Sequence, residues 1–417
     1  MANNKEKKVL NVPNSTDRGN VIRNVPALRF PEFTDEWKKI RLDSFTERVM
    51  RKNKNNLSKL PLTISAQYGL VDQITFFNKV VASTDMSNYY LLKKGEFAYN
   101  KSYSSDYPWG AIKRLDNYEQ GALSSLYICF APKDNVETDF ILQYFESPKW
   151  HKGVSEIAVE GARNHGLLNI SVQDFFHTHH YMPKDKKEQA KIAKLLMFLD
   201  ERIATQNKII EDLKKLKSAI IEEHYKHTQK QNACVADLGV PFNVGNLSKE
   251  ELSETGTSCV IYGELFTTYG EIINHVESHT NKLDGMTLSK KGDLLFPSST
   301  TVDALSLIAP SAINVDNVIL GGDMFGIHIN SGFNAQYLSY YFNHLAKKQF
   351  AKHAKGSTII HLHYKDIEKA QLLLPCLVEQ NKMAACLVLL DEKIRIESSH
   401  LQSVVKQKMY LLHQMFI

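Results

Sequence analysis

Apolar residues recur every three to four positions through two long segments, which begin near Glu188 and Glu379. Steps of 3.5 residues through the first segment select Ile192, Leu196, Leu199, Ile203, Gln206, Ile210, Leu213, Lys217 and Ile220. The same steps through the second select Met383, Leu387, Leu390, Ile394, Glu397, Leu401, Val404, Lys408 and Leu411. Both stripes are apolar except at two positions, which are polar in both segments. A sustained 3.5-residue period is typical of a coiled-coil seam.

Each long segment needs a partner to cover its apolar stripe. One helix over 188–226 would be about 60 Å long at 1.5 Å per residue, and water alone would not stabilise it. The two segments are therefore predicted to pair with each other, rather than to serve as core helices of separate domains. If a pseudo-twofold axis relates them, the helices are antiparallel and residue i faces a residue near 605 − i. Gln206 and Glu397 then meet, and a polar pair there fixes the register.

The two segments also belong to an internal repeat. At an offset of 191 the matching pairs are Glu188/Glu379, Gln189/Gln380, Lys191/Lys382, Ala193/Ala384, Leu196/Leu387, Asp200/Asp391, Glu201/Glu392 and Ile203/Ile394. Upstream of them, LLKKGEFAYN (91–100) parallels LSKKGDLLFP (288–297), and FILQYFES (140–147) parallels YLSYYFNH (337–344). The matching segments follow one another in the same order in both halves of the chain, which indicates that a globular domain plus a long helix is duplicated.

Each globular copy mixes β-rich runs such as TSCVIYGELF (257–266) with helical ones, which predicts α+β domains of about 150 residues. The expected fold is two pseudo-symmetric α+β domains separated by two long antiparallel helices that form a coiled-coil spacer. The expected parts are a flexible tail (1–24), a first domain (25–185), a central helix (186–231), a second domain (232–375) and a C-terminal helix (376–417).

Composition excludes several classes of protein. The 417 residues are 43% hydrophobic and 23% charged, so the chain is neither disordered nor fibrous. No run approaches the 18–20 apolar residues of a membrane span, and the first residues lack the apolar core of a secretory signal. Five scattered cysteines without a C-x-x-C motif indicate reduced thiols and a cytoplasmic protein.

The net charge of +5 is unevenly distributed. Residues 186–232 carry eleven basic and seven acidic residues, whereas residues 233–375 carry ten and fourteen. Any binding to a polyanion must therefore depend on local clusters of lysine and arginine.

Enzyme motifs are missing from the sequence. It contains no phosphate-binding loop, no strand-anchored G-x-G-x-x-G, no G-x-S-x-G and no H-E-x-x-H. Two histidine groups, His177/His179/His180 and His361/His363, have a spacing that suits zinc on a strand. No third ligand follows at a typical spacing, so ordinary strand histidines are the preferred interpretation and no metal site is predicted.

Several polar and basic clusters suit nucleic acid, because lysine and arginine neutralise phosphates and asparagine reads base edges. In the first copy the candidates are Arg48, Arg51, Lys52, Asn53, Lys54, Asn100, Lys101, Tyr103, Lys113, Arg114, Arg163 and Asn164. In the second copy they are Ser298, Ser299, Thr300, Thr301, Lys347, Lys352, Lys355 and Ser357. The alternative is that the loops are simply solvated and the aromatic residues pack. The second copy, being acidic overall, needs its lysines grouped on one face.

The sequence resembles a known family at several points. VPALRFPEFTDEWKKIRLDSF (25–45) looks like the usual opening of the specificity subunit of type I restriction–modification systems. The repeated E-Q-x-K-[IM]-A…L-D-E-[RK]-I helices look like its two spacer regions. The segment before Pro183, G-x-x-x-x-G-L-x-x-x-S-x-x-D-F, looks like the end of its target-recognition domain. The second copy departs from this pattern, because IIHLHYKDI (359–367) has no clear arginine before it.

The resemblance implies a DNA-binding role without catalysis. Each globular copy would read one half of a split, asymmetric site in double-stranded DNA, and the helices would set the spacing. They would also dock two methyltransferase subunits, with restriction subunits joining the full complex. S-adenosylmethionine, ATP and Mg would then belong to those partners and not to this chain.

Two other functions remain open from the sequence. The chain could be a self-contained nuclease or methyltransferase only if its catalytic motifs were degenerate. A stand-alone two-module DNA-binding scaffold or regulator would have the same composition, and co-purification with a methyltransferase would separate the two cases.

Overall fold

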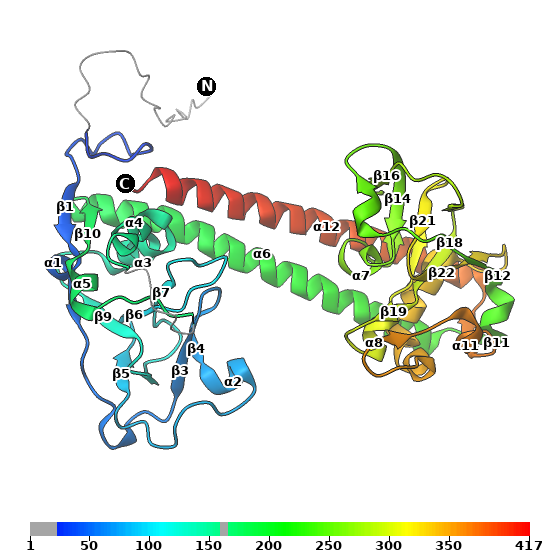
Figure 1. Cartoon of the computed structure of the whole chain (residues 1–417), viewed down its shortest axis with the longest axis horizontal. Coiled ribbons are helices and arrows are strands. Elements are labelled where there is room, and N and C mark those ends of the chain that lie inside the picture. The colour runs from blue at the N-terminus through cyan, green and yellow to red at the C-terminus, as the bar shows by residue number, and fades with distance from the viewer. Residues whose placement is uncertain (1–22, 159–165) are drawn as a thin grey trace, which may run out of the picture. The chain divides into compact units, whose positions relative to one another are not determined.

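The computed structural model describes residues 23–158 and 166–417 and divides the chain into two units (Figure 1). Unit 1 comprises 1–205 and 400–417, and unit 2 comprises 206–399. This division cuts both long helices, whereas the sequence-based bounds treat each helix as a part of its own, so those bounds stay a prediction. Arg163, Asn164 and nearly all of the tail lie outside the described residues.

Unit 1 contains two four-stranded sheets. The first has the order β2-β9-β6-β7, formed by Thr46–Arg48, Ile128–Pro132, Phe97–Asn100 and Ala111–Arg114. The second has the order β4-β3-β8-β5, formed by Gly69–Asp72, Pro61–Ser65, Gln120–Leu123 and Tyr90–Lys93. Within it, β3 and β8 are parallel and β5 and β8 antiparallel. A separate antiparallel ladder joins β1 (Lys38–Arg41) to β10 (His179–Met182).

Short helices complete unit 1. They are α1 (Leu42–Phe45), the 3-10 turn Lys54–Asn56, α2 (Gln73–Phe77), α3 (Thr138–Glu146), the 3-10 turn Pro148–Trp150, α4 (His151–Ser155) and α5 (Val172–His177). Aromatic rings from the sheet and the helices fill the core between them. Phe97 stacks on Phe130 with ring centroids 5.4 Å apart, and Tyr99 stacks on Phe175 at 4.9 Å. These rings tie β6 and β9 to α5, which supports the loop that precedes α5.

Unit 2 repeats this topology. Its first sheet, β12-β22-β18-β20-β15, is formed by Gly239–Asn243, Met324–Ile329, Asp293–Pro297, Ser311–Ile313 and Ile272–Ile273. Its second, β13-β16-β14-β21-β17, is formed by Leu252–Ser253, Ser278–Thr280, Thr257–Ile261, Ile319–Gly321 and Thr287–Leu288. The pair β14 and β21 is parallel and β17 and β21 antiparallel, as in their unit 1 counterparts. The predicted duplication is therefore confirmed at the level of strand order.

The other elements of unit 2 also have counterparts. The ladder β11–β24 (Lys230–Cys234 with Gln371–Pro375) corresponds to β1–β10, and β19–β23 joins Ser299–Thr300 to Ile360–His361. The helices are α7 (Glu264–Thr267), α8 (Ala304–Leu307), α9 (Ala335–Tyr340), α10 (Lys347–Phe350) and α11 (Tyr364–Ile367). The 3-10 turns are Val235–Leu238, Lys249–Glu251 and Ala351–His353, and a π-helical turn spans Tyr341–Leu345.

Two long helices, α6 (Lys186–His227) and α12 (Leu377–Gln414), pair antiparallel within each unit. In unit 2, Gln206 donates to the backbone oxygen of Glu397 at 3.2 Å, and Lys217 donates to Asp391 at 2.7 Å. In unit 1, Lys408 donates to Asp200. Each pair of residue numbers sums to within three of 605, so the predicted antiparallel register is confirmed.

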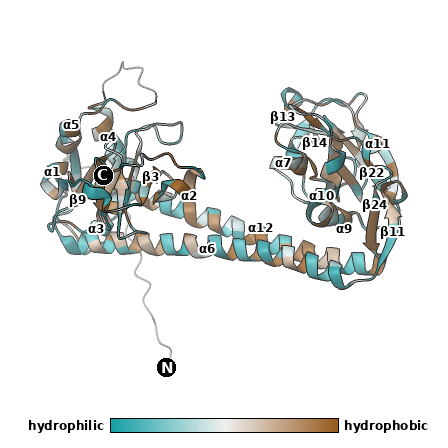
Figure 2. Cartoon of the chain, turned by 90° about the horizontal axis from the view of Figure 1, so that it is seen from below, coloured by the Kyte–Doolittle hydropathy of each residue, from teal (hydrophilic) through white to brown (hydrophobic). Residues whose placement is uncertain are grey.

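Burial follows the predicted stripe. All fourteen seam residues from Ile192 to Leu213 and from Met383 to Val404 are buried or half-buried, and none is exposed. Figure 2 shows the resulting alternation of hydrophobic and hydrophilic bands along both helices. Among the described residues, no helix is both long and apolar enough to cross a membrane.

The first turn of each long helix is fastened to its own globular domain by one glutamine. Gln189 donates to the oxygen of Pro183 at 2.8 Å and accepts the N–H of Glu137 at 2.8 Å. Gln380 donates to Pro375 at 2.8 Å and accepts from Asn334 at 3.0 Å. The repeat therefore carries a buried amide whose two polar atoms satisfy backbone groups of a loop and a helix start.

Candidate nucleic-acid interface

The two units build the same loop arrangement at the end of one central strand. In unit 2, β19 follows β18 and pairs with β23, so that Ser299 lies opposite His361. In unit 1, Ser102 in the segment after β6 forms an antiparallel β-bridge with Leu167. The N–H of Tyr103 also donates to Gly166 at 3.0 Å. Asn100, Lys101 and Tyr103 therefore occupy the place that Ser298–Thr301 occupy in the second copy, beside a returning loop.

In unit 2 the structure brings the predicted residues together. We define the β19–β23 edge as residues 298–301, 347–357 and 360–363. The backbones of Lys355 and His361 form an isolated antiparallel β-bridge. Helix α8 contacts β19, β23 and the 3-10 turn Ala351–His353, which carries Lys352. Lys347 contributes to the lowered pKa of Asp303, which arises chiefly from the backbone N–H of Ser306. Lys352 and Ser357 are exposed, whereas Ser298 and Ser299 are buried.

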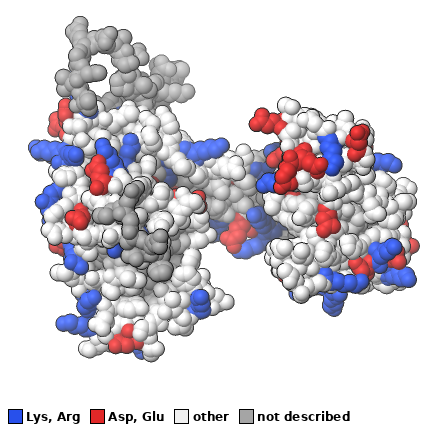
Figure 3. All heavy atoms as spheres, viewed as in Figure 1, with Lys and Arg blue, Asp and Glu red and all other residues white. Residues whose placement is uncertain are grey.

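The charge of unit 2 is segregated around this edge. Residues 347–369 hold six of the ten basic residues of 233–375 and only two of its fourteen acidic ones. The remaining residues, 233–346, hold four basic and twelve acidic residues. Figure 3 shows basic atoms over the region of α8 and α11 and acidic atoms over the region of β14 and β16. Most lysines of the second copy are thus concentrated in one segment, as an acidic domain would need in order to hold a polyanion, although Lys355 is paired with Asp366.

Two exposed lysines, Lys365 and Lys369, share this basic segment and were not selected from the sequence. They lie in and just after α11 and form no motif with the serines and threonines of β19. A charge count in a window of about twenty residues would have found them, because the local excess of lysine is the signal.

In unit 1 the run that begins at Arg48 is partly used inside the protein. Arg51 donates to both carboxylate oxygens of Glu96 at 2.7 Å. Lys52 donates to the oxygen of Asn88 at 2.9 Å and lies 4.1 Å from the centroid of the Tyr90 ring. Asn53 is fully buried, and its amide bonds the backbone of Ser58. Arg48 and Lys54 are exposed, so they are the members of the run that present their charge to solvent.

Lys113 and Arg114 hold β7 against α3. Lys113 pairs with Glu146 at 2.6 Å, and Arg114 pairs with Asp116 and Asp139, each at 2.7 Å. Each basic side chain is only 12% exposed. Their charge is therefore balanced within the domain, and their main role in the free chain is to fasten a strand to a helix.

The unit 1 candidates lie at two ends of one strand. Arg51 pairs with Glu96, which precedes β6, whereas Asn100 ends β6 and Lys101 follows it. Lys101 donates to the oxygen of Ile170 at 3.4 Å, and Tyr103 is 53% exposed. The structure therefore does not gather the first-copy residues into one patch, but it places 100–103 beside the segment at 166–170.

In the first histidine group His180 serves packing, whereas His177 and His179 are exposed. His180 is buried, with Tyr144 Oη 2.8 Å from its Nδ1 and Thr178 Oγ1 2.8 Å from its Nε2. Burial, together with neighbouring His179, lowers the pKa of His180 from 6.5 to about 3. In the second group, the His361 and His363 rings stack with centroids 6.1 Å apart. No cluster of three or more metal-binding side chains occurs within 23–158 and 166–417.

A buried ion network joins the unit 2 domain to its helices, and sequence analysis did not foresee it. Lys217 contacts Glu271 at 2.9 Å and Asp391 at 2.7 Å, and His344 lies 2.7 Å from Glu271. Burial alone would raise the pKa of Glu271, but the hydrogen bond from His344 and the charge of Lys217 lower it to about 2. The polar seam position at Lys217 was the available signal, since a lysine in an apolar stripe needs a carboxylate.

Comparisons with known proteins agree with this architecture. Residues 235–407 match the family model of the type I restriction modification DNA specificity domain. The S subunit of a type I restriction-modification system from M. genitalium has a similar fold, with a TM-score of 0.59, 16% identity, and coverage of 94% of this chain and 99% of that one.

A chain from a structure of complex assembly and conformational transition of the type I R-M system gives a TM-score of 0.53 at 13% identity. That alignment covers 90% of this chain and 96% of the other. No curated protein matches the chain in sequence. At these identities the solved structures establish the fold, and the family model matches the second globular domain and most of the C-terminal helix.

Proposed function

We propose that the chain, whose residues 235–407 match the family model of the type I restriction modification DNA specificity domain, is the specificity subunit of a type I restriction–modification complex. Each globular domain reads one half of a split, asymmetric DNA site. The helix pair sets the spacing of the half-sites and docks two methyltransferase subunits, which methylate adenine. Restriction subunits join the complex for cleavage.

One observation supports this proposal: the strand order of the region that matches the family model recurs among the strands of unit 1, which lie outside the matched residues. Both copies have the same order of strands around a central strand, β6 or β18, and the same returning loop beside its end. The loops nevertheless differ in chemistry, with Lys101 and Tyr103 in one and serines and threonines in the other. Two similar modules with different loops suit a DNA site whose halves differ.

Within each module, charge and hydrogen bonding have separate tasks. Exposed lysines such as Lys352 contact phosphates and position the domain, without reading sequence. The hydroxyls of Thr300 and Thr301, and Asn100 and Lys101 in unit 1, contact base edges, where a good bidentate pair is worth about 1–3 kcal/mol of discrimination. The residues that choose the sequence thus lie on loops held by a rigid sheet.

The proposal assigns the chemical steps to partner subunits. Specificity subunits of this family are in general non-catalytic, and this chain lacks the familiar motifs for nucleotide or S-adenosylmethionine chemistry. S-adenosylmethionine, ATP and Mg are therefore assigned to the methyltransferase and restriction subunits, which work with this chain in the cytoplasm. The target adenine must leave the helix to reach the partner's pocket.

Comparing DNA methylation in cells with and without this chain tests the proposal. The expected result is one split, asymmetric motif that is methylated only when the chain is present. Purified chain should bind the methyltransferase subunit and should not methylate DNA without it. Methylation by the chain alone would show an enzyme, and unchanged methylation together with no binding to the methyltransferase would favour a stand-alone DNA-binding regulator.

A further inference from the structure

A pocket of about 430 Å³ lies in unit 1 beside the β1–β10 ladder. The ladder lines it with Lys39 and His179, and Arg23 lines it from the segment before β1. Lys149, in the turn before α4, and Lys152, in α4, complete the basic lining. Four basic side chains from three segments of the chain therefore converge on one cavity, whose volume falls within the roughly 300–1,000 Å³ of common ligand sites.

The fold holds two of these lysines against the ladder. Lys149 precedes Trp150, whose ring is buried, so the core fixes the backbone that carries the lysine. Gly153 follows Lys152 and lets α4 lie close to β10, because a Cβ at this position would come within 3.3 Å of the Cβ of Thr178. The pocket is thus built by packing that a bulkier residue would disturb.

Few negative charges offset the four basic side chains. Among the described residues that line the pocket, Glu156 alone has an acidic side chain, and the carboxylate of Ile417 offsets a second charge. Within 23–158 and 166–417, no ion pair joins any of the four to a carboxylate. Burial lowers the pKa of Lys149, because its ammonium group is partly removed from water and no anion compensates.

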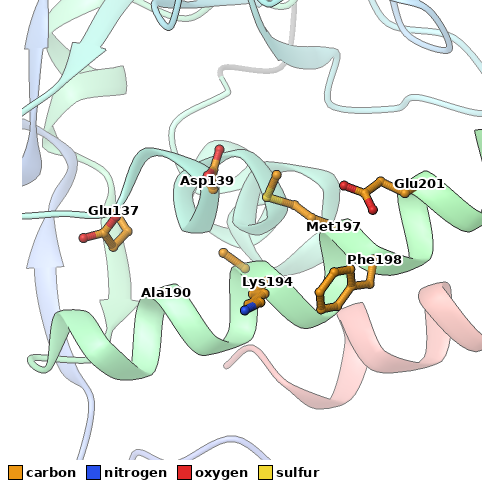
Figure 4. Close-up of a pocket in the computed structure, with 8 residues that line it drawn as sticks. Glu137, Asp139, Ala190, Lys194, Met197, Phe198 and Glu201 are labelled. Carbon is orange, nitrogen blue, oxygen red and sulfur yellow. The ribbon is translucent and has the colours of Figure 1, made fainter.

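Another groove of unit 1, between α6 and the start of α3, shows the contrast (Figure 4). Of its acidic residues, Glu137 pairs with Lys186 at 3.3 Å and Asp139 pairs with Arg114 at 2.7 Å. Most charge in that groove is therefore balanced inside the domain. The pocket beside the β1–β10 ladder instead keeps an excess of positive charge that a ligand can use.

The second copy does not repeat this charge in its own ladder. Counted back from Pro183 and Pro375, and through the register of the two ladders, Lys39 corresponds to Asn232 and His179 to Gln371. Both replacements are uncharged. A site that one copy alone carries is separate from the tasks that the two copies share, which are reading DNA and pairing the long helices.

We propose that this pocket binds the phosphate groups of a small phosphorylated molecule, such as a nucleoside triphosphate or pyrophosphate. Lysine and arginine are the usual side-chain partners of phosphate, and converging cations suit a ligand with two or three phosphate groups. Lys149 is half-buried, so it faces an anion that enters the cavity and not the convex surface of a double helix. Such an anion would also offset the burial of the charge of Lys149.

Calorimetric titration of the full chain tests the proposal, with pyrophosphate, tripolyphosphate and ATP as the probes and about 0.15 M salt to screen loose surface binding. We expect one saturable site per chain and a melting midpoint that rises with probe concentration. Tighter binding of ATP than of tripolyphosphate would identify a nucleotide as the ligand. Equal binding of the two would identify the phosphate groups alone as the recognised part.

Variants of the pocket provide the specific test. Lys39→Gln and Lys149→Gln should each weaken probe binding by about tenfold or more, because each removes a charged hydrogen bond to phosphate. Lys208→Gln changes an exposed lysine of α6 outside the pocket and should keep the wild-type affinity. Lys149→Gln removes a half-buried charge, so the melting midpoint without probe should not fall, which separates lost binding from lost folding.

Two outcomes would overturn the inference. Weak, unsaturated binding that is equal in wild type and in the pocket variants would mean an adventitious ion only. Displacement of the probe by a short DNA duplex, together with weaker duplex binding by Lys39→Gln and Lys149→Gln, would assign these lysines to the DNA interface. Neither outcome touches the role proposed above, because the titration needs no methyltransferase and measures no methylation.

Discussion

Lys217 Nζ lies 2.7 Å from Asp391 Oδ1, and this contact joins α6 to α12 in unit 2. The repeat produces the same contact in unit 1, where Lys408 of α12 pairs with Asp200 of α6. Both lysines occupy one of the two polar positions of their seam, and both carboxylates belong to the repeated L-D-E sequence. A pseudo-twofold relationship thus exchanges the roles of the two helices, and each end of the seam has a charged pair that opposes sliding.

Lys217→Met should destabilise the chain by about 1–3 kcal/mol, because Glu271 and Asp391 lose the cation that they share in a half-buried site. Lys217 is only 7% exposed, so water cannot replace the lost contact well. The measurement is the midpoint of urea unfolding followed by circular dichroism. Asp391→Asn added to Lys217→Met should restore part of the loss.

Lys215→Met on the same helix is the control. Lys215 pairs with Glu211, but both side chains are more than 60% exposed. Solvent screens an exposed i,i+4 pair and its contribution to stability is small, so this variant should unfold close to wild type. Equal losses at 215 and 217 would mean that the buried network does not stabilise the seam.

Gln189→Ala and Gln380→Ala should each cost about 1–3 kcal/mol, since each strands a buried N–H and a buried C=O. Amide hydrogen exchange gives the sharper measurement. Exchange at Glu137 should accelerate in the first variant and exchange at Asn334 in the second, with little crossover. Gln402→Ala, at an exposed position of α12, should change neither amide.

Lys352→Ala should weaken DNA binding by the assembled complex and make it less dependent on salt. Loss of one phosphate contact lowers the slope of log K against log salt by about 0.9. Lys113→Ala removes a lysine that is already paired with Glu146, so it should reduce stability and leave the slope unchanged. The measurement is a titration of labelled DNA at several salt concentrations. A slope that Lys352→Ala does not alter would remove the β19–β23 edge from the interface.

His180 should make stability depend on pH. The unfolded chain takes up this proton near pH 6.5, and the folded chain only near pH 3. Between those values the unfolded state binds more protons, so stability falls as the pH is lowered through this window, by at most about 1.4 kcal/mol per unit. Glu271, whose pKa is lowered to about 2, adds a similar loss only below the ordinary glutamate pKa of 4.5.

Urea midpoints at pH 7.5 and pH 5 measure the effect of His180. His180→Gln keeps a hydrogen-bonding side chain but does not titrate, so its two midpoints should lie closer together than those of wild type. His413→Gln, at an exposed position, should keep the wild-type difference. The same difference in all three proteins would assign the pH dependence to other groups.

Local chemistry explains why some predictions succeeded. The 3.5-residue stripe from Ile192 to Leu213 defines the seam, because an apolar stripe on a long helix has to be covered by another. Gln206 and Glu397 form a hydrogen bond, as the predicted antiparallel register requires. The order of matching segments was enough to predict duplication, since repeated sequence folds into repeated strands. The basic residues proposed to contact DNA were harder to predict. The sequence does not distinguish a lysine that faces water from one that, like Lys113, is paired with a carboxylate.

The sequence by itself determined the two copies, the helix pair and its antiparallel register, because periodicity and repetition are properties of the order of residues. Only the tertiary structure decided which charges are balanced internally, how residues 298–301 and 347–357 come to share one edge, and that Phe416 packs on Trp37 in unit 1. Those outcomes depend on distances between residues far apart in the chain. Burial and ion pairing are set by such distances, and local sequence does not encode them.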